Sequence, residues 1–217
     1  MSINSIKLLN IQKRSDQLIN SFDKIPNDTY LKEKFCYRKR CYCTGNIENG
    51  IFRWNESPEL FCQSEHLNKY VGGVSRQFQP ISELIRKDIE THVIMNVFSS
   101  LPQVNYKVGV HQIRIIANEF NQGMPTPEGI HQDGFDFVAV GCINASNVSG
   151  GISFILNAQD HTEVAFEGVL NPGSLILFSD RTYAHYTSNI SPKLPGVAQR
   201  DVVVATFQYE DMSKLTH

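Results

Sequence analysis

The segment Ser174-Leu175-Ile176-Leu177-Phe178-Ser179, followed by Tyr183-Ala184-His185-Tyr186-Thr187-Ser188, contains the pattern that decides the fold class. Each run is short, carries β-branched or aromatic residues, and is bounded by Gly, Pro, Asn or Asp, which is typical of β-strands. Runs of the same kind occupy residues 108–116, 136–144, 152–157, 162–167 and 202–209. So many short strands in the second half of the chain predict a sandwich or barrel.

Two turns are expected between these strands. In Asn171-Pro172-Gly173 the proline presets φ and the glycine supplies a left-handed position, so a tight turn is predicted. Gly150-Gly151 offers two residues that tolerate positive φ, and we expect a tight hairpin there.

The first half of the chain favours helices and one hairpin. A short amphipathic helix is expected around residues 18–22, ending before Pro26. Alternation of apolar and polar residues over 35–54, with Asn49-Gly50 as a turn, predicts a β-hairpin. Apolar residues recur every three or four positions over 81–98, which predicts a helix with one apolar face.

These elements predict a mainly β fold with flanking helices, whose core is a double-stranded β-helix, the cupin-like jelly roll. At 217 residues and 41% hydrophobic content, the chain can form one well-buried domain. We therefore expect a single domain over residues 1–217. Residues 1–107 would form the helical and hairpin flank, and residues 108–210 the jelly-roll core.

Composition excludes several classes of protein. The net charge of −2 gives no general attraction to nucleic acid. No run approaches the roughly 18–20 apolar residues of a membrane span, and the amino terminus lacks the apolar core of a secretion signal, so a cytoplasmic location is expected. The five cysteines lack the paired spacing of a zinc site and are expected to be reduced thiols. Nothing in the sequence predicts an oligomeric state.

Two clusters in the predicted hairpin region are most simply structural. Arg38-Lys39-Arg40 could meet an anion, but it is more typical of a solvated strand edge. Tyr37, Phe52, Trp54 and Phe61 are expected to pack the helical layer onto the sheet. A contribution of the hairpin to a substrate pocket stays open.

A set of potential metal ligands lies within the strand-rich region. His131 and Asp133 are two residues apart, so in a strand both side chains point to one face. His185 follows 52 positions after Asp133 and could complete the set from a neighbouring strand. Two histidines and one carboxylate form the facial triad of non-haem iron(II) oxygenases. Either histidine alone is more often a core or surface residue than a ligand.

Arg200 lies fifteen residues after His185, where the strand at 202–209 begins. A planar guanidinium matches the geometry of a carboxylate. The alternative is a surface arginine that pairs with Asp201 or with solvent.

These motifs carry a family resemblance. The segments 127–138, 147–151, 180–185 and 200–207, with 70–78 and 111–115 upstream, resemble the bacterial 2-oxoglutarate/Fe(II)-dependent dioxygenases that include L-isoleucine 4-hydroxylase. The resemblance covers roughly residues 35–210. It implies iron held by His131, Asp133 and His185, with Arg200 paired to the distal carboxylate of 2-oxoglutarate.

The resemblance also implies a reaction. Such an enzyme uses Fe(II), 2-oxoglutarate and O2, with ascorbate as a supportive reductant, and produces succinate and CO2. Its expected substrate is a free L-amino acid, with an aliphatic side chain favoured, which is hydroxylated at an unactivated C–H bond. The presence of Asp133 argues against the related halogenases, which carry a small apolar residue at that position.

Three residues are candidates for binding the substrate. Gln112 and Arg114 share one face of the strand at 111–116, and if that face lines the barrel, Arg114 could bind a carboxylate beside Gln112. An ion pair between strand and helix is an equally good reading of Arg114. Asp136 could receive an amino group, or could bond local backbone amides.

Two rival functions remain at this point. The same metal centre could act on a different small metabolite, or catalyse desaturation or sulfoxidation. Alternatively, the chain could be a non-catalytic, cupin-like binding module in which the His-x-Asp pair is incidental or holds a structural metal.

Overall fold

The structure is a computed structural model that describes residues 6–57, 59–66 and 68–210. Its helical segments are α1 (Asp16–Ser21), η1 (Phe22–Lys24), α2 (Glu83–Ile89), η2 (Glu90–Ile94) and α3 (Met95–Phe98). Its strands are β1 (Lys7–Asn10), β2 (Arg38–Glu48), β3 (Ile51–Trp54), β4 (Tyr106–Ala117), β5 (Phe137–Ser146), β6 (Val148–Gly150), β7 (Ile152–Asn157), β8 (Val164–Val169), β9 (Ser174–Ser179), β10 (Tyr183–Thr187), β11 (Ile190–Pro192) and β12 (Ala198–Tyr209). No helix within the described ranges is long and apolar enough to cross a membrane.

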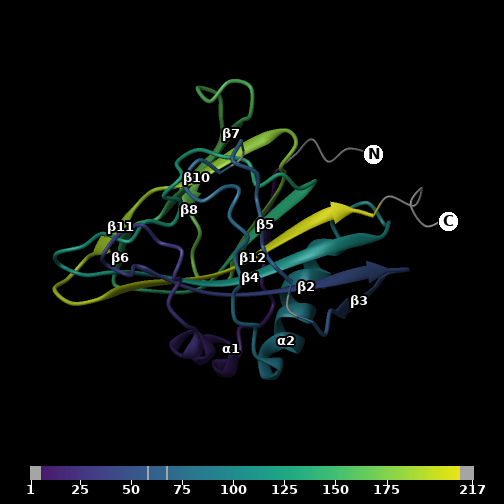
Figure 1. Cartoon of the computed structure of the whole chain (residues 1–217), viewed down its shortest axis with the longest axis horizontal. Coiled ribbons are helices and arrows are strands. Elements are labelled where there is room, and N and C mark those ends of the chain that lie inside the picture. The colour runs from purple at the N-terminus through teal and green to yellow at the C-terminus, as the bar shows by residue number, and fades with distance from the viewer. Residues whose placement is uncertain (1–5, 58, 67, 211–217) are drawn as a thin grey trace.

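The strands form two layers. The larger sheet has the order β1-β9-β5-β12-β4-β2-β3, and its neighbouring strands are antiparallel. Smaller sheets, β10-β7-β8 and β11-β6, form the opposite layer, while the helices lie on the far side of the large sheet (Figure 1). The expected fold class, a mainly β jelly roll with flanking helices, is confirmed. The expectation of a single domain stays a prediction.

The helical layer follows the predicted apolar pattern. α1 begins after Ser15, whose hydroxyl accepts a hydrogen bond from the backbone of Leu18 at 3.0 Å. The helix expected over 81–98 is present from 83 to 98, with the π-helical turn η2 in its middle. Its buried residues Ile85, Ile89 and Val93 share a core with the large sheet. This burial attaches the helices to one face of the sheet and leaves the other face for the barrel interior.

The predicted turns differ in outcome. The hairpin of β2 and β3 turns at Asn49 and Gly50, which have φ of 51° and 78°, as expected. The backbone N–H of Ser174 donates to the carbonyl of Asn171 at 2.8 Å, which closes the turn predicted around Pro172. The prediction of a tight hairpin at Gly150-Gly151 is wrong. β6 pairs with β11 and β7 pairs with β8 and β10, so the chain moves between two sheets at these glycines.

The basic and aromatic residues of the hairpin are placed differently from what their sequence pattern predicts. β2 is an inner strand, between β3 and β4, and the side chains of Arg38 and Arg40 are buried. The interpretation of this cluster as a solvated strand edge is therefore wrong. Phe52 packs with the helices as expected, whereas Phe61 belongs to a separate cluster with Tyr42.

The antiparallel register defines which side chains share a face of the large sheet. Across β2, β4 and β12, Arg40 is opposite Ile113, and Ile113 is opposite Val202. Residues two apart along each strand follow the same face, because side chains alternate. We call this the inner face; its members are Arg38, Arg40, Tyr42, His111, Ile113, Ile115, Arg200, Val202, Val204 and Thr206. The intervening residues, such as Gln112, Arg114 and Asp201, lie on the helix-covered face.

Candidate metal centre

Three potential ligands converge between the two layers. One ligand atom from each of His131, Asp133 and His185 lies within 4.8 Å of the others. The Nε2 atoms of His131 and His185 are each 3.6 Å from an oxygen of Asp133. Two imidazole nitrogens and one carboxylate oxygen at this spacing could hold one divalent transition-metal ion and leave its remaining positions open.

Backbone contacts bring the two histidines together. His185 lies in β10, and its backbone N–H donates to the carbonyl of His131 at 2.8 Å, with the reciprocal bond at 3.1 Å. His131 is an isolated bridge residue, and Asp133 lies in the loop after it. The pair does not lie in a regular strand, so the alternation of a strand does not explain their shared orientation, but both side chains reach the same site as predicted.

A hydrogen bond orients the ring of His131. Its Nδ1–H donates to the carbonyl of Gly129 at 2.9 Å, so Nε2 is the nitrogen that faces Asp133 and that a metal ion would bind in place of a proton. Such an outer contact fixes the tautomer that metal binding requires. The Nδ1 of His185 has no hydrogen-bond partner among the described residues.

The site stabilises positive charge. Burial raises the pKa of Asp133, but its hydrogen bond with His131 and the two imidazoles outweigh burial, so the pKa is lowered. For His131, burial lowers the pKa, yet Asp133 and Glu128 outweigh it and raise the pKa to about 9. Burial and the neighbouring His131 lower the pKa of His185 to about 3. One cation between these side chains is therefore favoured, as a metal site requires.

Two residues that the sequence analysis did not single out hold Asp133 in place. The carboxylate of Asp180 accepts the backbone N–H groups of Asp133, Gly134 and Phe135 at 2.6–3.1 Å. The side-chain amide of Gln63 donates to Oδ1 of Asp133 at 2.9 Å. No motif could have indicated Gln63, because it lies 70 positions away in an irregular loop.

A cavity of about 90 Å³ adjoins the three potential ligands. Its wall combines the inner face of the large sheet with loops that carry Gln63, Arg76 and Glu128. Pockets for drug-sized ligands are typically about 300–1,000 Å³, so this one suits a small molecule.

Arg200 is buried on the inner face of β12. It is not itself a lining residue of the cavity, although Val204 and Thr206 on the same face are. Its Nη2 has no hydrogen-bond partner among the described residues. Burial lowers the pKa of Arg200. A Cβ at Gly151 would lie 3.4 Å from Cδ of Arg200, in van der Waals contact, so the Gly151 backbone lies directly beside the Arg200 side chain. The alternative reading, a surface arginine paired with Asp201, does not hold because Asp201 faces the other way and contacts Arg114.

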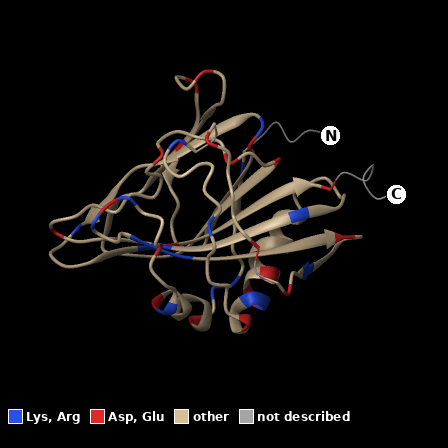
Figure 2. Ribbon diagram, in the orientation of Figure 1, with Lys and Arg blue, Asp and Glu red and all other residues tan. Residues whose placement is uncertain are grey.

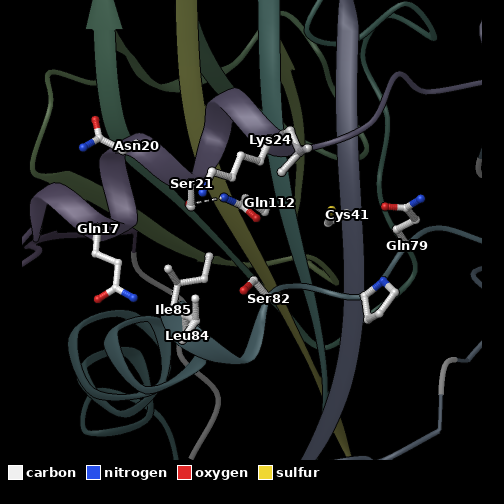
Figure 3. Close-up of a pocket in the computed structure, with 12 residues that line it drawn as sticks. Gln17, Asn20, Ser21, Lys24, Cys41, Gln79, Ser82, Leu84, Ile85 and Gln112 are labelled. Carbon is white, nitrogen blue, oxygen red and sulfur yellow. Dashed lines mark hydrogen bonds between the residues drawn. The ribbon is translucent and has the colours of Figure 1, made fainter.

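Arg114 and Gln112 lie on the helix-covered face and are absent from the cavity wall. Arg114 forms a buried ion pair with Asp201 at 2.6 Å and also contacts Asp23 of η1. The amide of Gln112 donates to the hydroxyl of Ser21 at 2.7 Å, between α1 and the sheet (Figure 3). The condition for their substrate role, a face that lines the barrel, is not met. Arg114 instead forms the ion pair between strand and helix that the sequence also allowed.

Asp136 contacts residues that are distant from it in the sequence, at the end of β12 away from Arg200. Its carboxylate accepts hydrogen bonds from the backbone of Tyr209 at 2.7 Å and the amide of Gln208 at 2.6 Å, and it pairs with Arg181 at 3.1 Å. Asp136 does not line the cavity. The backbone amide that Asp136 binds belongs to Tyr209, 73 positions away, so the expected bonding of local backbone amides is not what the structure shows.

Comparison with protein families identifies the chain. The model of the 2OG-Fe dioxygenase family matches residues 19–206. The chain belongs to this family. The family's name states the reagents its members use, 2-oxoglutarate and iron, and the non-catalytic alternative loses its basis. The resemblance noted from the sequence motifs is confirmed.

Two curated relatives match most of the chain. L-isoleucine-4-hydroxylase of Bacillus thuringiensis is 24% identical over 187 residues, covering 78% of this chain and 76% of the relative. The 3(1)-hydroxy-L-isoleucine 4-dioxygenase of Pantoea ananatis is 26% identical over 185 residues, covering 77% and 74%.

Solved structures share the fold. A BsmA homologue from Methylobium petroleophilum superposes with a TM-score of 0.80 at 23% identity, covering 95% of this chain and 89% of that one. The IDO structure from Bacillus thuringiensis gives a TM-score of 0.71 at 17% identity, covering 95% and 91%. At these identities the comparison supports the jelly-roll fold.

Proposed function

We propose that the chain hydroxylates an unactivated C–H bond of a free L-amino acid with an aliphatic side chain, in a reaction that consumes 2-oxoglutarate and O2. The observation that carries this proposal is the convergence of His131, Asp133 and His185 beside a small cavity, in a chain of the 2OG-Fe dioxygenase family. The amino-acid substrate rests on the names of the two relatives, which refer to L-isoleucine and a hydroxylated L-isoleucine.

The residues present fit iron and the cosubstrate. His131, Asp133 and His185 would hold iron(II) through two Nε2 atoms and a carboxylate oxygen, the donor set of non-haem oxygenases. The unpartnered guanidinium of Arg200 would bind the distal carboxylate of 2-oxoglutarate. With iron bound, O2 and 2-oxoglutarate supply the oxidising power, giving succinate, CO2 and one oxygen atom inserted into the substrate. Ascorbate would support the enzyme by keeping iron reduced.

The chain's own residues hold the reactants in position. Gln63 and Asp180 fix the Asp133 loop, and the Gly129 carbonyl fixes the His131 ring. Arg200 would orient 2-oxoglutarate by donating hydrogen bonds to its distal carboxylate. Several of the lining side chains, among them Arg76 and His111, are buried, which limits the access of water to the reacting atoms.

The test is succinate formation by the purified chain with iron(II), ascorbate, 2-oxoglutarate and O2, for each proteinogenic amino acid in turn. We expect one aliphatic amino acid to raise succinate above the substrate-free rate and to gain the mass of one oxygen atom. If turnover is stimulated without that mass gain, the product reveals desaturation or another oxidation. If no amino acid stimulates turnover but the iron-dependent basal rate persists, the amino-acid proposal fails and another small metabolite is the substrate.

A further inference from the structure

Three arginines line the metal cavity, and a carboxylate neutralises one of them. Nε of Arg38 lies 2.8 Å from an oxygen of Asp28, and both side chains are almost fully buried. Arg40 and Arg76 have no carboxylate oxygen within 4.0 Å among the described residues. Buried charges without a counter-ion are costly and rare.

Neutral groups hold the guanidinium of Arg40. Its Nε and Nη2 lie 3.1–3.2 Å from the ring nitrogens of His111, and its Cζ lies 5.0 Å and 4.8 Å from the ring centroids of Phe61 and Phe78. Its Nη1 donates to no described residue. Burial and Arg40 keep the pKa of His111 well below its usual value, so the imidazole is neutral. These contacts fix the guanidinium without cancelling its charge.

Arg76 is held in a similar way from a loop. Its side chain is 1% exposed, its Nη2 donates to Oε1 of Gln63 at 2.9 Å, and its Cζ lies 4.6 Å from the Phe61 ring centroid. Its Nε has no hydrogen-bond partner among the described residues. Burial lowers the pKa of Arg40 to about 9 and also lowers that of Arg76, so an anion beside them would relieve an unfavourable charge.

The cavity's own acids and the cosubstrate do not supply that anion. Asp133 and Glu128 contact His131 at the metal centre, at 3.6 Å and 3.3 Å. 2-Oxoglutarate has two carboxylates, of which one would bind the metal and the other Arg200. Arg40 and Arg76 remain without a carboxylate in contact once both carboxylates of 2-oxoglutarate are placed.

We propose that Arg40 and Arg76 form a subsite for the carboxylate of the substrate. This rests on the proposed function and replaces the earlier candidates Arg114, Gln112 and Asp136. Charge-assisted hydrogen bonds from guanidinium to carboxylate are strong and directional, so the subsite would select an acid over its neutral amide. The substrate's carboxylate would fix which of its C–H bonds faces the metal.

The experiment measures equilibrium binding by titration calorimetry without O2, so that no turnover occurs. The protein carries iron(II) and 2-oxoglutarate, and the probes are the proteinogenic L-amino acids and propionate, each compared with its carboxamide. Bonds to charged groups contribute about 1.5–3 kcal/mol, so we expect the tightest-binding acid to bind roughly 10- to 150-fold more tightly than its amide. In Arg40→Met and in Arg76→Met this preference should fall to within about threefold, by the same reasoning.

Lys39→Met is the matched control. Lys39 lies between Arg38 and Arg40 on β2 but opposite Arg114 in the register, on the helix-covered face, so its removal should leave the acid preference intact. Arg40→Lys and Arg76→Lys keep a positive charge and should retain part of the preference, which a role confined to orienting His111 or Gln63 would not produce. Affinity for 2-oxoglutarate, titrated separately, should stay unchanged in all of these variants.

Three results would overturn the subsite. The first is that acid and amide bind the wild-type protein with equal affinity, and the second is that none of the probes binds. The third is that the arginine variants weaken the binding of 2-oxoglutarate as much as the binding of the acid, which would assign these arginines to the cosubstrate. Iron-dependent succinate formation without acid selectivity contradicts the subsite and leaves the proposed reaction intact. Acid selectivity without succinate formation contradicts the reaction and leaves the subsite intact.

Discussion

The two faces of the large sheet differ in how their buried arginines are paired. On the helix-covered face, Arg114 is paired with Asp201 and Asp23. On the inner face, Arg38 pairs with Asp28, whereas the guanidiniums of Arg40 and Arg200 are buried without a carboxylate. The contrast is sharpest on β12, where the neighbouring residues Arg200 and Asp201 point to opposite faces. Figure 2 shows basic residues gathered where β2, β4 and β12 run side by side.

We interpret the difference as a division between charges that stabilise the fold and charges that, in the proposals above, bind a ligand. In a buried ion pair the protein supplies both charges, and removing one of them leaves the other uncompensated. An unpaired buried guanidinium is unfavourable until an anion arrives, so ligand binding can recover that energy. Variants on the two faces should therefore separate effects on stability from effects on ligand affinity.

The largest effect on stability is expected for Arg114→Met. Because Asp201 is 0% exposed, the variant leaves its charge buried without a partner, which should lower the free energy of unfolding by about 3–5 kcal/mol. Urea denaturation measures this. Arg181→Met is the control, since the Arg181 side chain is 60% exposed and its pair with Asp136 should contribute less than about 1 kcal/mol. A loss for Arg114→Met no larger than for the control would remove the distinction between the faces.

Arg200→Met should show the opposite pattern. We expect the affinity for 2-oxoglutarate, titrated with iron(II) and no O2, to fall about 10- to 150-fold, since bonds to charged groups contribute about 1.5–3 kcal/mol. The ligand-free variant should not be less stable, because an uncompensated buried charge has been removed. Unchanged affinity together with a large loss of stability would make Arg200 a structural residue.

Gln63→Leu tests the support of Asp133. Loss of the hydrogen bond from the Gln63 amide should weaken metal binding about 10- to 100-fold, the usual effect of removing an outer contact to a ligand. Competition of iron(II) with a chelator measures it. Gln77→Leu, in the same part of the chain but exposed, is the control. Equal metal affinity in both variants would show that the loop holds Asp133 without Gln63.

The smallest effect is expected for Gln112→Leu on the helix-covered face. Losing the hydrogen bond to Ser21 should cost about 0.5–1.5 kcal/mol of stability, with no change in amino-acid or 2-oxoglutarate affinity. Thermal unfolding and the titrations described above measure both. A loss of amino-acid affinity in this variant would restore the helix-covered face as part of the substrate site.

Much of the fold could be predicted because local pattern and tertiary structure agree. The apolar period of 81–98 and the turn at Asn49-Gly50 encode their own conformations. β1, β6 and β11 were missed since they are three or four residues long and depend on their partner strands. Gly150-Gly151 was misread because tolerance of positive φ does not specify which strands the turn joins.

For the site, sequence spacing identified which residues could act together. It could not predict which face of a strand points toward the cavity. His131, Asp133 and His185 converge even though the first pair lies in a loop, because the contact to β10 and Asp180 fixes it. The face of Arg114 could not be assigned until the register with β12 was known. Arg76 lines the cavity from a loop, and a loop has no regular alternation of side chains from which this contact could be predicted.

The most direct test of the central claim compares iron-dependent succinate formation in the wild-type protein and His185→Ala, across the amino-acid panel. His161→Ala is the control, because His161 is exposed in the segment between β7 and β8. We predict succinate formation that requires iron(II) and O2 in the wild type and in His161→Ala, and none above background in His185→Ala. A wild-type rate in His185→Ala, or no succinate from the wild type under any condition, would contradict the assignment of the metal centre.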